Sequence, residues 1–211
     1  MAEAAVTGWV EEALASSTAE GCTVIVQESH EANLRWAGNA LTTNGSMTQR
    51  RATVISTAGV EGGTAASSVS GPLAGPDDLR ELVRQADAAV RDAPADDEAQ
   101  PLVGGTVDED YAEPAEVVGP EDLAGFARDL GAAFTHAGDA GHLLFGFAEY
   151  RRTTTWLANT EGLRRRAVEP WGRLELNAKA PDMVNSAWVR GQTNVFTDVD
   201  VPAMHADLER R

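Results

Sequence analysis

The chain has 211 residues and a mass of 22.3 kDa, and its 17 basic and 33 acidic residues give a net charge of −16. Such an acidic surface repels phosphate groups, which argues against general binding to nucleic acids or anionic membranes. The first 21 residues contain no Lys or Arg, and no apolar run in the chain is long enough to span a bilayer, so we expect a cytoplasmic protein.

The first 91 residues show the pattern of a helix, several antiparallel strands and a second helix. Asn44-Gly45 predicts a hairpin turn, because a type I′ turn needs positive φ at both central residues, and Gly62-Gly63 predicts another turn. Hydrophobic spacing and β-branched content predict helices over 3–19 and 76–91, and strands over 22–27, 33–37, 40–43, 48–57 and 64–70. Gly38-Asn39 separates the strands over 33–37 and 40–43.

The composition changes after residue 91. Between Asp92 and Asp122 there are eleven acidic residues, several prolines and no Lys or Arg. Few large apolar side chains are present, so burial cannot offset the cost of ordering this stretch. We interpret residues 92–118 as an exposed linker or a long wrapping loop, and we expect a protease to cut there first.

A second helix-then-sheet unit follows, over residues 119–211. Alternating polar and apolar residues from Arg173 to Asn177 indicate a half-buried strand. Asp198 and Asp200 precede the last helix, where carboxylates act as caps. The predicted elements are a helix over 121–137, strands over 143–151, 153–158, 163–178 and 186–196, a turn over 159–162 and a helix over 202–211.

The predicted fold class is therefore α+β, with two helix-plus-antiparallel-sheet units joined by an acidic, proline-containing linker. The corresponding domains are an N-terminal domain over 1–91, the linker or loop over 92–118, and a central domain over 119–211.

The sequence contains no recognisable catalytic or metal-binding motif. Cys22 is the only cysteine, which excludes a disulfide and a thiolate zinc cluster, and its place in a buried strand indicates a packing role. His136 and His142 are six residues apart and share no helix face, while His30 and His205 stand alone. We therefore expect four dispersed histidines and no stoichiometric zinc.

Arg164, Arg165 and Arg166 form the one local basic run. With Arg151, Arg152 and Arg173 they could bind a peptide carboxylate or an acidic partner segment, or they could pair with the acidic linker of their own chain. We expect the three to be exposed at the polar rim of a partner interface, so replacing all of them with Glu should weaken partner binding and leave folding nearly intact.

Two stretches resemble the TldD/PmbA family. The first is Leu34-Arg35-Trp36-Ala37 followed by Asn39-Ala40-Leu41-Thr42-Thr43-Asn44-Gly45. The second resembles the family's central domain, and it comprises Thr153–Leu157, Asn159–Gly162, Arg173–Lys179, Ser186–Trp188 and Phe196–Asp200. The sequence of these stretches is most similar to that of the TldE-type members, and the resemblance covers nearly the whole chain.

The resemblance implies a function that the residues alone do not. Members of the family form a TldD–TldE zinc metallopeptidase that degrades unfolded peptides, and an early name for them was modulator of DNA gyrase. TldD carries a His-Glu-x-x-x-His zinc motif in a C-terminal domain. By this resemblance, the present sequence would end before that domain begins. The motif is absent here, so the resemblance implies no catalytic or metal residue in this chain and zinc only in a catalytic partner.

The resemblance therefore favours a non-catalytic TldE-type subunit, in an oligomer with a TldD-like subunit, that contacts unfolded peptides. The alternative is a stand-alone regulatory or peptide-binding module without protease activity. The residues expected to contact partner or substrate are Arg35, Asn39, Thr42, Asn44, Gly45, Arg164, Arg165, Arg166 and Asn177.

Overall fold

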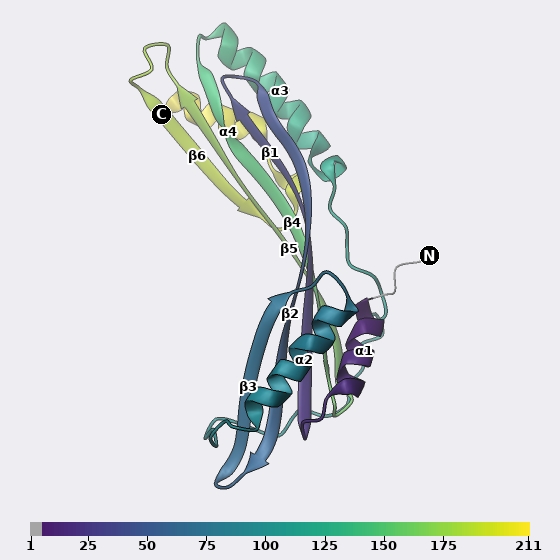
Figure 1. The fold of residues 1–211 in the computed structure, drawn as a ribbon. Coiled ribbons are helices and arrows are strands. Elements are labelled where there is room, and N and C mark those ends of the chain that lie inside the picture. The colour runs from purple at the N-terminus through teal and green to yellow at the C-terminus, as the bar shows by residue number, and fades with distance from the viewer. Residues whose placement is uncertain (1–5) are drawn as a thin grey trace. The chain divides into compact units, whose positions relative to one another are not determined.

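The computed structural model describes residues 6–211, which form an α+β fold, as predicted (Figure 1). No helix within this range is both long and apolar enough to cross a membrane. The elements are α1 (Val6–Ser16), β1 (Gly21–Ala37), β2 (Leu41–Val60), β3 (Gly63–Pro72), α2 (Pro76–Val90), the 3-10 helix η1 (Pro120–Leu123), α3 (Ala124–Asp139), β4 (Leu143–Asn159), β5 (Arg164–Lys179), β6 (Ser186–Thr193), the 3-10 helix η2 (Phe196–Asp198) and α4 (Val201–Arg210).

The six strands belong to one sheet in the order β3-β2-β1-β4-β5-β6. Strand β2 pairs antiparallel with β3, with Val60 opposite Gly63, and β5 pairs antiparallel with β6, with Lys179 opposite Ser186. Strands β1, β2, β4 and β5 have 16 to 20 residues each, whereas an average strand has about five or six residues. Strands β3 and β6 are the two edges of the sheet.

The described chain forms two compact units, and each combines three separate segments. The first unit contains residues up to 28 together with 49–115 and 153–168, and the second contains 29–48, 116–152 and 169–211. The long strands therefore contribute one part to each unit. That residues 1–91 and 119–211 form separate domains remains a prediction.

The core of the first unit lies between its strands and helices α1 and α2. Trp9, Val10 and Leu14 are buried on α1, as the apolar spacing predicts, while the start of the predicted helix at residues 3–5 lies outside the described range. Cys22 is fully buried in this core, and burial raises the pKa of its thiol. Its packing role is consistent with both observations.

The hairpin turn between β1 and β2 lies at the predicted strand break, Gly38-Asn39, and not at Asn44-Gly45, where the turn is predicted. The turn is formed by Gly38 and Asn39, with φ of 61° and 63°, and Asn44-Gly45 lies inside β2. The Asn39 side chain explains the choice, because its Oδ1 accepts from the Leu144 amide at 2.7 Å and its Nδ2 donates to the His142 carbonyl at 2.8 Å. These bonds tie the turn to the start of β4.

The acidic segment contains no helix or extended strand, and several hydrogen bonds attach it to the first unit. The Asp96 amide donates to the Thr64 carbonyl of β3 at 2.8 Å, and most of the remaining bonds lie after Leu102. Asn159 Nδ2 donates to the Val103 carbonyl at 2.9 Å, and the Gly105 amide donates to the Glu161 carbonyl at 3.0 Å. Val107 then forms a parallel bridge with Arg164. These contacts hold residues 103–107 against the first unit, and the linker or loop over 92–118 remains a prediction.

Candidate functional site: the exposed sheet face and edge of the second unit

The sheet of the second unit has one buried and one exposed face, because side chains alternate along its strands. Leu174, Leu176 and Val189 are buried in a core that also includes Leu130 of α3 and Leu208 of α4. The residues between them point to the opposite face. The predicted alternation from Arg173 to Asn177 is confirmed.

This opposite face gathers aromatic rings and basic side chains from four strands. Arg151 lies 5.0 Å from the centre of a Trp171 ring, and Arg173 lies 5.0 Å from Phe147 and 5.6 Å from Trp171. Further pairs are Lys179 over Phe145 at 5.4 Å and Arg190 over Trp188 at 5.6 Å. We call these residues, together with Arg35, the aromatic–arginine face.

One carboxylate within the aromatic–arginine face orders its centre. Glu149 accepts from Arg173 Nε at 2.8 Å and lies 4.0 Å from Arg35. The hydrogen bond to Glu149 raises the pKa of Arg173, so this guanidinium stays charged. Glu31 and Glu175 also act electrostatically on Arg173, so the five basic residues of the face stand beside three carboxylates, which leaves a small local excess of positive charge on an acidic protein.

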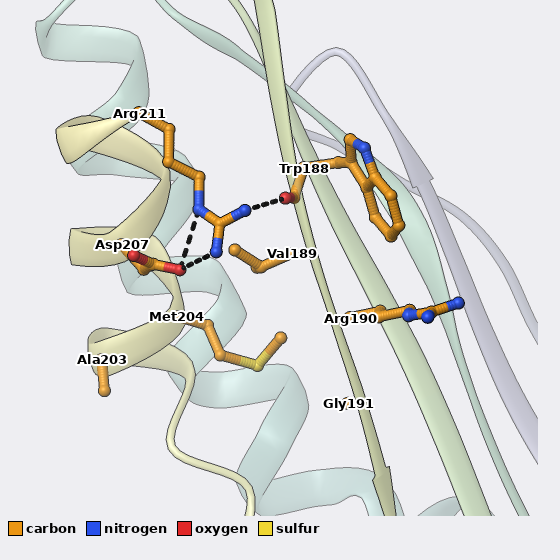
Figure 2. A pocket seen from close by; sticks show the side chains of 8 residues that line it. All are labelled: Trp188, Val189, Arg190, Gly191, Ala203, Met204, Asp207 and Arg211. Carbon is orange, nitrogen blue, oxygen red and sulfur yellow. Dashed lines mark hydrogen bonds and ion pairs between the residues drawn. The ribbon is translucent and has the colours of Figure 1, made fainter.

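The aromatic–arginine face ends at the edge strand β6, which borders a groove against α4 (Figure 2). The groove has a volume of about 530 Å³, and Val189 and Met204 line its interior. Arg211 crosses it, with Nη2 2.8 Å from Asp207 and Nη1 donating to the Trp188 carbonyl at 3.3 Å. Figure 2 shows the Trp188 ring on the far side of β6 from α4.

The contact to Trp188 shows which backbone groups of β6 point away from the sheet. Residues two apart on a strand direct their backbone groups to the same side, so Arg190 and Gln192 share the outward direction of Trp188. No strand among residues 6–211 pairs with β6 on that side. An extended chain can therefore add to this edge through main-chain hydrogen bonds.

The residues that the sequence predicts as contacts fall into separate places. Arg35 and Asn177 lie on the aromatic–arginine strands, with Asn177 directly opposite Trp188. Asn39 has the turn role described above. Thr42, Asn44 and Gly45 lie on the β2 end of the same unit, where Thr42 and Asn44 are exposed. A contact role for these residues remains a prediction.

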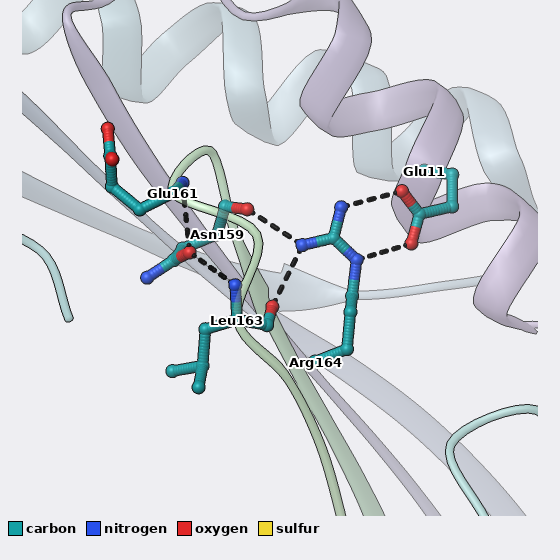
Figure 3. A network of polar contacts seen from close by, with 5 residues as sticks. All are labelled: Glu11, Asn159, Glu161, Leu163 and Arg164. Atoms are coloured by element: carbon teal, nitrogen blue, oxygen red, sulfur yellow. Dashed lines mark hydrogen bonds and ion pairs between the residues drawn. The ribbon is translucent and has the colours of Figure 1, made fainter. Parts of the chain in front are cut away.

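The basic run at residues 164–166 makes contacts within its own unit (Figure 3). Arg164 binds both carboxylate oxygens of Glu11, at 2.6 and 2.8 Å, and Figure 3 shows its other nitrogen directed at the Asn159 and Leu163 carbonyls. The alternative of pairing with the acidic segment therefore holds for the other two residues. Their nearest carboxylates are Asp108 for Arg165, at 3.1 Å, and Asp110 for Arg166, at 3.0 Å.

The assumption that all three arginines are exposed is wrong. The side chain of Arg165 is 54% exposed, but that of Arg164 is only 18% exposed and that of Arg166 only 7%. Arg166 also donates to the Pro114 carbonyl at 2.8 Å. Replacing Arg164 or Arg166 would therefore perturb the structure, whatever it does to partner binding.

Two of the four histidines lie together, contrary to the sequence interpretation, while His30 is apart from them, beside Thr48. His136 on α3 and His205 on α4 have ring centres 5.2 Å apart, and His136 Nε2 lies 3.0 Å from Glu209 Oε1. Burial lowers the pKa of His205, which favours its neutral form. The spacing of His205 and Glu209, one helical turn apart, was the signal in the sequence that could have indicated this group.

The arrangement defines a class of fold: an α+β protein in which long strands run through two helix-covered units. No protein-family profile matches the sequence, and no curated protein matches it. Solved structures do. The crystal structure of TldE from Thermococcus kodakarensis superposes with a TM-score of 0.68 at 12% identity, over 98% of this chain and 47% of that one.

Two further structures are similar over 97% of this chain, and both are described as candidate modulators of DNA gyrase. The one from Bacteroides thetaiotaomicron has a TM-score of 0.63 at 11% identity, and the one from Thermotoga maritima has a TM-score of 0.63 at 13% identity. The chain spans about half the length of each, 48% and 47% respectively. At these identities the likeness shows a shared fold.

Proposed function

We propose that the chain is the N-terminal and central part of a TldE-type subunit of a cytoplasmic TldD–TldE zinc metallopeptidase. The observation that carries the proposal is the fold shared with TldE over 98% of this chain. The Arg-Trp-Ala and Leu-Thr-Thr-Asn-Gly motifs between Leu34 and Gly45 support it independently, because they come from the sequence alone.

The subunit's task in this proposal is to hold an unfolded peptide rather than to cut it. Proteolysis in this proposal needs the His-Glu-x-x-x-His zinc motif of a TldD-like partner. His30-Glu31 of this chain does not complete that motif, because Arg35 stands where the second histidine would be required. No catalytic step is therefore assigned to this chain.

The exposed edge of β6 supplies binding without sequence preference. A peptide in extended conformation would pair with the outward backbone groups of Arg190 and Gln192, as in β-strand addition. The neighbouring aromatic and guanidinium groups would contact its side chains, with acidic and aromatic residues favoured by charge and by stacking. Because main-chain bonds provide most of the contact, many unfolded sequences could be held.

The experiment measures binding of a fluorescent, acidic, unstructured peptide to the 211-residue chain. We expect Trp188→Ala to weaken binding, since it removes the exposed ring beside the edge. Gln192→Pro should weaken it further, because proline removes one outward N–H while leaving the hydrogen bonds to β5 in place. Two matched controls should bind normally: Gln192→Ala, and Arg128→Ala on an exposed position of α3.

A second assay tests the assembly. The chain should co-purify with a TldD-type subunit and raise its rate of peptide cleavage. Peptide binding without any association with such a subunit would favour the stand-alone module instead. Peptide binding that is unchanged in both Trp188→Ala and Gln192→Pro would refute the proposed role of the β6 edge.

A further inference from the structure

Helices α3 and α4 bring three metal-ligating side chains together on the second unit. His205 and Glu209 are separated by four positions on α4, so both project from the same helix face. His136 comes from the last turns of α3. One ligand atom from each of the three lies within 4.8 Å of the other two.

These distances are close to those of a zinc site. Zinc–nitrogen bonds of about 2.0–2.1 Å in tetrahedral geometry place neighbouring ligand atoms roughly 3.4 Å apart. The His136–Glu209 pair is already at 3.0 Å. Because the side chains of His136 and Glu209 are 65% and 37% exposed, small rotations about their side-chain bonds can close the remaining gap.

The third side chain is held in place. His205 is only 7% exposed, and its ring meets that of His136 edge-on, at an interplanar angle of 86°. A site with one fixed and two adjustable ligands needs little reorganisation to bind an ion. An imidazole–carboxylate hydrogen bond alone would explain His136 and Glu209, but it does not use His205.

We propose that His136, His205 and Glu209 form a binding site for a divalent transition metal such as Zn²⁺, with the remaining coordination position open to water. Two imidazoles and one carboxylate are a donor set that zinc accepts, with a fourth position left for solvent. The ion would join α3 to α4. This site is separate from the zinc expected in a catalytic partner and does not depend on the proposed function.

The surroundings set an upper limit on the affinity. The pocket beside His205 and Glu209, of about 280 Å³, is also lined by His142, Lys179 and Arg211. The positive charges of Lys179 and Arg211 oppose a bound dication. Arg211 is partly compensated by its ion pair with Asp207. We therefore expect a reversible site rather than a permanently filled one.

Isothermal titration of the metal-free 211-residue chain with zinc chloride tests the proposal. We expect one ion per chain, and His136→Gln and Glu209→Gln should each weaken binding at least about tenfold, the loss that removing even an outer-shell partner can cause. Both positions are exposed enough for the variants to fold, which circular dichroism would verify. His30→Gln, the same substitution outside the cluster, should bind as the parent does.

Two further readouts separate a site from nonspecific binding. Cobalt(II) should give visible absorption bands in the parent chain that disappear in His136→Gln. Zinc at about 100 times its dissociation constant should raise the melting temperature by roughly 5–10 °C in the parent but not in Glu209→Gln. Absence of binding, or binding that both substitutions leave unchanged, would overturn the proposal.

Discussion

The carboxylate of Asp87 should be one of the most important polar groups for the stability of the first unit. Asp87 lies on α2 and is only 5% exposed. It accepts hydrogen bonds from Ser56 Oγ and from the Thr18 amide, both at 2.6 Å, and from Ser17 Oγ at 3.1 Å. The one carboxylate thus connects α2, β2 and the segment that links α1 to β1.

The substitution Asp87→Asn keeps the shape of the side chain but replaces one acceptor oxygen with a donor. An amide nitrogen that faces the Thr18 N–H loses that bond, because both groups are donors. An amide nitrogen that faces Ser56 can donate to its hydroxyl, but the Ser56 proton then loses its acceptor, and in both orientations the hydrogen bonds to a charged group are lost. Hydrogen bonds to a charged group contribute about 1.5–3 kcal/mol, and a buried unsatisfied donor costs about 1–3 kcal/mol. We expect a loss of roughly 2–4 kcal/mol, or a melting temperature lower by about 5–15 °C.

The pH dependence provides an independent check. Burial raises the pKa of Asp87, but the hydrogen bonds from Ser56, Thr18 and Ser17 together outweigh it, so the pKa lies below its ordinary value of 3.8. A lowered pKa contributes stability above pH 3.8 that is lost as the pH falls through the folded-state pKa. The difference between parent and Asp87→Asn should therefore be largest at neutral pH and should narrow in acid.

Thermal denaturation followed by circular dichroism, at pH 7 and at successively lower pH, measures both effects. Asp97→Asn, the same substitution at an exposed position of the same unit, should change stability by less than about 0.5 kcal/mol. The role assigned to this carboxylate is wrong if Asp87→Asn and Asp97→Asn have the same melting temperature at neutral pH. It is also wrong if the stability difference between the parent and Asp87→Asn stays the same in acid.

Three further predictions concern the acidic segment, the basic run and one glycine. Limited proteolysis should cut within residues 92–101 before 103–118, and mass spectrometry of early fragments would show the order. In chemical denaturation, Arg166→Glu should destabilise the protein by about 3 kcal/mol or more and Arg165→Glu by less than about 1 kcal/mol, since only Arg166 is buried. Gly146→Ala should prevent stable folding, because φ is +153° and a Cβ would overlap the Glu175 carbonyl oxygen.

The elements that depend on local pattern could be predicted from the sequence. The apolar stripe of α1 and the start of α2 at Pro76 follow from helical spacing and from the preference of proline for a first turn. The sequence also predicts a break between strands at Gly38-Asn39, but not that the hairpin turn lies there, because Asn39 is held by two hydrogen bonds to residues more than 100 positions away. Asn-Gly at 44–45 satisfies the same local rule and lacks those distant partners.

The candidate site could be predicted only in part, for a similar reason. Alternation along one strand identified Arg173 and Asn177 as facing away from the core. The partners of Arg173 come from other places in the sheet, since Phe147 and Glu149 lie on β4. Which rings and charges meet depends on strand register, and a single sequence does not specify the register between strands.

The two groups of basic residues differ in what they leave available for a partner. Arg164 and Arg166 direct their donors at carboxylates and carbonyls of their own unit, so binding a partner would first require breaking those bonds. Arg151 and Arg190 are stacked on aromatic rings, and an aromatic ring does not use up the in-plane N–H donors of a guanidinium.

Stacking also restricts the side chain before any ligand arrives, which lowers the entropy that binding must remove. A carboxylate on an incoming peptide could therefore accept from Arg190 without displacing an internal acceptor. A run of basic residues in a sequence identifies charge, but the availability of that charge depends on the partners that the fold provides. For this chain, the arginines that are separated in sequence and stacked on the sheet are better placed for recognition than the three that are consecutive.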